Sequence, residues 1–155
     1  MEINRRTFLT RAGAGSAALA ALPLLLQADE QRARAEDIGF RPAALLKSST
    51  TDTGQPLEFP AGPNEITAFV VELAPGGKHD RHLHPVPIFA YVLEGTLTLA
   101  VEGHGEKTYP AGTAHLEPVN TWHMDLNRGQ TRVKWVAVFM GQKGKPFVIS
   151  GPKLG

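Results

Sequence analysis

The sequence predicts an all-β protein, a single small barrel of short strands. Its length of 155 residues indicates one domain. The 16 Gly and 12 Pro divide the chain into many short segments. Segments rich in β-branched and aromatic residues recur about every ten residues, and no helical apolar period follows residue 36. A barrel of about eight strands has an interior just wide enough for side chains or one small ligand.

The predicted barrel extends over residues 65–141. Its expected strands are separated by turn residues and are 65–74, 88–94, 96–102, 106–110, 113–117, 121–126 and 132–140. Gly95 is expected at a hairpin position that needs positive φ. Residues 36–64 are expected to form an N-terminal arm that could hold one strand, residues 75–80 a turn, and residues 142–155 a C-terminal tail.

The first 35 residues have the pattern of a secretion signal. Arg5 and Arg6 precede a mildly apolar stretch, 12–26, which at about 15 residues is shorter than the roughly 20 needed to span a bilayer. Ala33-Arg34-Ala35 fits a cleavage site, with Ala28 as a poorer alternative. An uncleaved amphipathic helix or membrane anchor is the competing interpretation.

The RR-x-F-L core around Arg5 resembles the twin-arginine signal. The resemblance implies recognition by the twin-arginine export machinery, a bacterial periplasmic or secreted location, and no stable membrane span after cleavage. That route carries folded proteins, so a metal could be loaded before export.

Charge and cysteine content exclude several classes. The net charge is +1, but residues 1–35 carry five Arg and three acidic residues, so the remaining 11 basic and 12 acidic residues give −1. Nucleic acid is therefore not an expected partner. Because the chain has no Cys, any metal must bind to His, carboxylate or water.

Three histidines form the candidate metal site. His82 and His84 are two residues apart and would point to the same face of a strand, and His123 lies on a later strand that can face them. Three neutral imidazoles on one side of an ion leave positions open for water or substrate. His79 and His104 are expected to be solvated in turns.

Two segments carry a family resemblance. Residues 76–95 and 112–127 resemble the first and second cupin motifs, through Gly76, His82, His84, Gly95, Gly112, Pro118, His123 and Asn127. Asn120 stands where the second motif usually has glycine, a mild change because Asn tolerates positive φ. The resemblance implies a jelly-roll barrel (double-stranded β-helix), one divalent metal on the three histidines, and a homodimer.

The main departure from the cupin pattern is Ile88, which occupies the place of the usual metal-binding glutamate. The site is then either a three-His site, as in some cupin dioxygenases, or one in which Glu117 takes part. Glu117 could bind the metal directly, but the favoured expectation is that it accepts a hydrogen bond from a ligating imidazole. Candidate pocket-wall residues are Ile88, Phe89, Tyr91, Trp122, Met124 and Phe139.

Three classes of function remain open. One is an Fe(II)-dependent dioxygenase acting on a small organic substrate, with Glu117 and His115 as the only candidate acid–base residues. The second is a metal- or ligand-binding module without turnover, and the third is a metal-assisted isomerase using Zn, Mn or Ni. A three-His site would carry the full charge of the ion and would favour an anionic chelating ligand.

Overall fold

The computed structural model describes residues 39–152. Residues 1–43 and 44–155 form separate units. The predicted signal segment and its cleavage site after Ala35 lie outside the described residues. Within the described part, no helix is long and apolar enough to cross a membrane.

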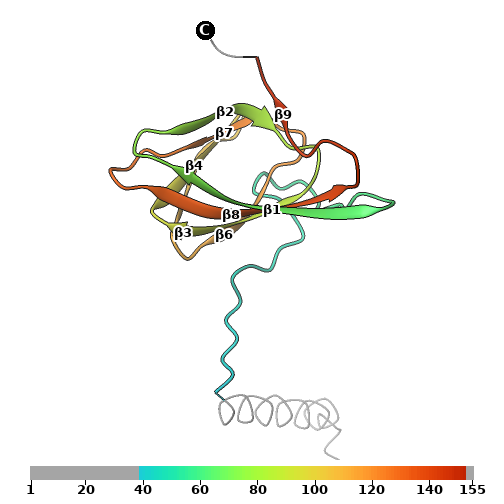
Figure 1. Ribbon diagram of the computed structural model, residues 1–155, viewed down its shortest axis with the longest axis horizontal. Coiled ribbons are helices and arrows are strands. Elements are labelled where there is room, and N and C mark those ends of the chain that lie inside the picture. Colours follow the sequence, from blue (N-terminus) through green and yellow to red (C-terminus); the bar gives the residue numbers. More distant parts are fainter. Residues whose placement is uncertain (1–38, 153–155) are drawn as a thin grey trace, which may run out of the picture. The chain divides into compact units, whose positions relative to one another are not determined.

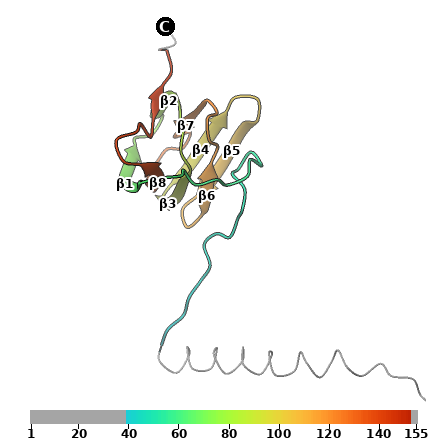
Figure 2. The ribbon, with the colours of Figure 1, turned by 90° about the vertical axis from the view of Figure 1, so that its right-hand side faces the viewer.

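The second unit consists of two antiparallel sheets, which confirms the all-β prediction (Figures 1 and 2). One sheet has the order β1-β8-β3-β6 and the other β5-β4-β7-β2-β9. The strands are β1 Asn64–Leu73, β2 Lys78–Leu83, β3 Ile88–Glu94, β4 Thr96–Val101, β5 Gly105–Pro110, β6 Ala114–Glu117, β7 His123–Leu126, β8 Val133–Gln142 and β9 Ile149–Ser150.

Three segments differ from the sequence expectation. The expected turn at 75–80 is shorter, because β2 already begins at Lys78. The expected tail supplies β9, which pairs with β2 through Ser150 opposite His82. The described part of the arm, residues 39–63, contains no strand but only one isolated bridge, between Thr50 and Pro56.

Side-chain alternation fills the space between the sheets. On β3 the inward residues Ile88, Ala90 and Val92 are buried, whereas the intervening Phe89 and Tyr91 are only half-buried on the outer face. The expectation that Phe89 and Tyr91 line the pocket is therefore wrong, because successive strand residues point to opposite faces. Leu97, Leu99 and Val101 on β4 of the other sheet belong to the same core, as do Val133 and Trp135 on β8 beside β3.

The motif residues outside the histidines hold the turns of the barrel. Gly95 has φ +72°, and a Cβ there would lie 2.5 Å from the carbonyl oxygen of Arg132, so both conformation and space require glycine. Asn120 adopts φ 52°, as its place in the motif implies. The buried Asn127 donates from Nδ2 to the carbonyls of Leu73, Ala74 and Thr131.

Candidate metal centre

Strand register brings the three predicted histidines together. His82 on β2 lies directly opposite His123 on β7. His84 follows the end of β2 and is held by a bridge to Val119. All three side chains are buried, and one ring nitrogen from each lies within 4.8 Å of the others. The group is therefore compact enough to hold one metal ion.

Backbone carbonyls fix which nitrogen of each ring faces the others. Nδ1 of His82 lies 2.7 Å from the Asp80 carbonyl, Nδ1 of His84 lies 2.8 Å from that of Phe147, and Nδ1 of His123 lies 2.8 Å from that of Thr121. A carbonyl only accepts, so each Nδ1 carries the proton and each Nε2 keeps its lone pair.

The three Nε2 atoms are the ones left to bind an ion. Among the described residues, Nε2 of His82 and Nε2 of His123 have no hydrogen-bond partner. Burial lowers the pKa of His82 to about 4 and the pKa of His84 to about 3. Both rings are thus neutral at neutral pH, which is the form that binds metal.

Glu117 lies beside two of these Nε2 atoms, those of His84 and His123. Its side chain is buried, and its Oε2 is 3.5 Å from Nε2 of His84 and 3.4 Å from Nε2 of His123. Two donors bound to one ion at about 2.1 Å, with angles of 90–110°, lie about 3.0–3.4 Å apart. The carboxylate is therefore close to the spacing of a fourth ligand.

The hydrogen-bonding role expected for Glu117 needs a free Nδ1–H, and all three Nδ1 atoms already face carbonyls. The geometry instead favours the alternative in which Glu117 supplies the missing carboxylate.

Burial raises the pKa of Glu117. Burial alone would lower the pKa of His123, but the adjacent Glu117 raises it.

Ile88 and Glu117 are partners in the sheet. They lie directly opposite each other in the β3–β6 ladder, so their side chains share the inner face. Ile88 is 1% exposed and belongs to the hydrophobic core. The carboxylate absent from position 88 is thus found on the neighbouring strand, at the paired position.

Two residues line the site that the sequence did not place there, Asp125 and His79. His79 is exposed, as expected, but lies on β2 rather than in a turn. The two residues lie opposite each other on β7 and β2, and a β-bulge between His79 and His82 brings both imidazoles to one face, where their rings stack at 3.8 Å. Oδ2 of Asp125 is 3.4 Å from Nδ1 of His79 and 3.7 Å from Nε2 of His82. His79, His82 and Asp125 form a second group with metal-ligand spacing.

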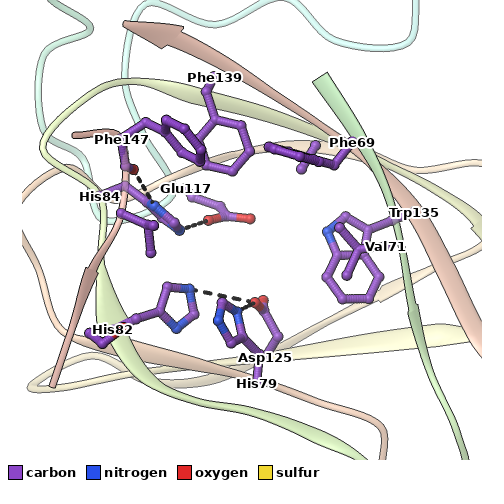
Figure 3. Close-up of a pocket in the computed structure, with 13 residues that line it drawn as sticks. Phe69, Val71, His79, His82, His84, Glu117, Asp125, Trp135, Phe139 and Phe147 are labelled. Atoms are coloured by element: carbon purple, nitrogen blue, oxygen red, sulfur yellow. Dashed lines mark hydrogen bonds and ion pairs between the residues drawn. The ribbon is translucent and has the colours of Figure 1, made fainter. Parts of the chain in front are cut away.

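A cavity of about 240 Å³ opens beside the histidines (Figure 3). Its polar side holds Glu117, Asp125 and the imidazoles of His79, His82 and His84. Its apolar side is formed by Phe69, Val71, Trp135, Ala137, Phe139 and Phe147. Phe139 lines the cavity as expected.

Three expected wall residues do not line this cavity: Tyr91, Trp122 and Met124. Met124 alternates between the inward His123 and Asp125 and therefore points out. Trp122 packs against the Arg81 guanidinium, whose carbon lies 3.9 Å from the ring centroid. Ile88 likewise lies in the core rather than on the cavity wall.

The remaining histidines lie apart from the cavity. His104 is exposed, as expected. His115 is buried behind Glu117, with its Nε2 3.9 Å from Oε1 of Glu117 and its ring stacked on Tyr109 at 3.8 Å. It does not line the cavity, so it has no direct access to a ligand there.

The barrel, its motif glycines and the histidine cluster agree with a comparison against known families, in which residues 69–139 match the cupin domain. The barrel has the cupin fold. The chain spans between 26% and 45% of the length of the three similar solved structures described next. No curated protein matches the chain.

Three similar solved structures are of enzymes. A DMSP lyase from Ruegeria pomeroyi is 19% identical, with a TM-score of 0.51 over 58% of this chain and 45% of that one. An oxalate decarboxylase from Lactobacillus farciminis is 26% identical, with a TM-score of 0.49 over 55% and 26%. An oxalate oxidase with bound glycolate is 25% identical, with a TM-score of 0.48 over 54% and 45%. The likeness to the DMSP lyase is one of fold and leaves the substrate of this chain open.

Proposed function

We propose that this chain is an exported, metal-dependent cupin that holds one divalent ion on His82, His84 and His123, with Glu117 as the fourth donor. The observation that carries the proposal is the orientation of the rings. Each Nδ1 is tied to a backbone carbonyl, and the Nε2 atoms of His84 and His123 both approach Oε2 of the buried Glu117. Three imidazoles and a carboxylate suit Fe(II), Mn, Ni or Zn.

The proposed activity is oxidation of a small organic molecule with O2, with Fe(II) as the favoured ion. When bound, such an ion would polarise a ligand and hold two reactants together. Four protein donors would leave further positions of such an ion open to a ligand. The apolar side of the cavity, including Trp135 and Phe139, would exclude water from those positions. Oxygen uptake by the iron-loaded protein tests this activity. If none of a set of phenols, enols and thiols causes oxygen uptake, the alternative of a binding module without turnover is favoured.

The export part of the proposal rests on the sequence of the first 35 residues. N-terminal sequencing of exported protein should begin at Glu36, after the Ala33-Arg34-Ala35 site. Replacing Arg5 and Arg6 by Lys should leave precursor in the cytoplasm. Undiminished export of that variant would mean that another route is used.

Moving the carboxylate between paired strands tests the ligand role of Glu117. Glu117→Gln keeps the shape but removes the charge, and we expect metal affinity to fall by more than the roughly 10–100-fold typical of a residue that only supports a ligand. Glu117→Ile should do the same. The double variant Ile88→Glu/Glu117→Ile places a carboxylate at the opposite ladder position, and we expect affinity to return to within roughly tenfold of wild type, because paired Cβ atoms are only about 5 Å apart.

Competition with a chromophoric chelator measures each affinity. Glu106→Gln is the matched control, because Glu106 is exposed and pairs with Arg128 away from the cavity. If Glu117→Gln binds metal as tightly as this control, Glu117 is not a ligand. If Glu117→Gln binds metal far more weakly and the double variant Ile88→Glu/Glu117→Ile does not regain the affinity, a carboxylate at residue 88 does not reach the ion.

A further inference from the structure

The cavity beside the histidines has an unusual charge composition. Glu117 and Asp125 both line it, and among the described residues no Lys or Arg does. A ligand carrying several negative charges would therefore meet carboxylates without a cationic side chain to offset them. With a divalent ion on the three histidines, Glu117 would be its carboxylate donor, which leaves Asp125 as the carboxylate that can pair with a ligand.

Asp125 has a carboxylate oxygen that no protein group satisfies. The residue is 3% exposed, and within residues 39–152 its Oδ1 has no hydrogen-bond partner. Its Oδ2 faces the imidazoles of His79 and His82 at 3.4 and 3.7 Å. Burying a carboxylate oxygen without a hydrogen-bond partner destabilises the folded protein, unless a bound ligand or water supplies that partner.

Aromatic rings form the other side of the same cavity. Phe69, Phe139 and Phe147 pack together with ring centroids 4.8–5.8 Å apart, and Trp135 lies beside them. In Figure 3 these rings face the side of the cavity that carries Glu117 and Asp125. Aromatic faces attract cations, and their edges and faces pack well against methyl groups.

We infer that this cavity binds a small organic cation of the alkylated-ammonium class, with Asp125 as its counter-ion and the aromatic rings packed against its alkyl groups. At about 240 Å³ the cavity is below the roughly 300–1,000 Å³ of drug-sized sites, so the ligand is small. The inference deepens the proposed function by naming a ligand class for the same site. Its core, the Asp125 subsite, does not require the metal.

Two probes of the same shape test it: choline and 3,3-dimethyl-1-butanol, which differ in that a carbon replaces the charged nitrogen. Calorimetry on metal-free and Zn²⁺-loaded protein should show choline binding roughly tenfold or more tightly than the alcohol. Asp125→Asn should reduce that preference to less than about threefold, whereas the exposed control Glu106→Gln should keep it.

The wild-type comparison alone can overturn the inference, whatever the variants do. Equal or tighter binding of the neutral alcohol, or failure of choline to bind at all, contradicts it. A choline preference that survives Asp125→Asn contradicts the role of Asp125. Metal binding is measured separately: if the protein takes up no ion but still prefers choline, the proposed function fails and the cation subsite stands.

Discussion

Acid should destabilise the metal-free protein, because its core holds neutral imidazoles. Burial lowers the pKa of His82 to about 4, of His84 to about 3 and of His115 to about 4. In an unfolded chain each would titrate near 6.5. Below that pH the unfolded chain takes up protons that the folded chain does not. The stability that these residues contribute is therefore complete above about pH 6.5 and is lost as the pH falls toward their folded pKa values.

The size of the effect follows from these values. At pH 5, about 1.5 units below the unfolded pKa, each of the three residues costs about 2 kcal/mol. Together the three imidazoles cost about 6 kcal/mol at pH 5. The raised pKa values of Glu117 and His123 act in the opposite direction and reduce this loss. The expected loss is a large share of the roughly 5–15 kcal/mol that stabilises a typical domain.

Urea unfolding of chelator-treated protein at pH 7 and pH 5 measures this loss, with the fluorescence of the buried Trp135 as the signal. His115→Leu should lose about 2 kcal/mol less than wild type between the two pH values, because one of the three imidazoles is gone. The exposed control His104→Gln should behave as wild type. A wild-type difference below about 1 kcal/mol would refute the reasoning.

Three further outcomes are expected. At pH 7, His115→Leu should be at least as stable as wild type in urea, because neither ring nitrogen of His115 has a hydrogen-bond partner in the described part of the chain. Asn127→Ala should lower the free energy of unfolding by about 2 kcal/mol, since the carbonyls of Leu73, Ala74 and Thr131 lose the buried amide that donates to them. The edge strand β1 exposes Ile66 and Val70, so light scattering should find a homodimer that Val70→Lys converts to monomer; a monomeric wild type would contradict this.

The sequence was most informative where spacing maps directly onto a strand face. His82 and His84 are two residues apart, and the structure directs both rings toward His123 although His84 lies beyond the end of β2. The glycine at 95 and the strands on either side of it were predictable because turn chemistry and alternation are local. The same alternation should have excluded Tyr91 and Met124 from the cavity, since each is next to an inward residue.

The rest of the site depends on pairing between distant segments. Simple alternation puts His79 and His82 on opposite faces, and only the β-bulge brings them together. The relation between Ile88 and Glu117 is a register between β3 and β6, which spacing along the chain does not reveal. Asp125 could have been predicted as a site residue, because it is two residues from His123 and therefore on the same face of the strand. Its buried carboxylate lines the cavity and removes the reason to expect an anionic ligand there.

Metal stoichiometry tests the central claim most directly. Protein purified through its export route, stripped of metal, reloaded with excess Fe(II), Mn²⁺ or Zn²⁺ and desalted should retain one divalent ion per chain by mass spectrometry. His82→Ala and His123→Ala should retain none, because each removes an Nε2 ligand, and the exposed control His104→Ala should match wild type. An ion-free wild type, or full occupancy in His123→Ala, would contradict the claim that these converging nitrogens form a metal centre.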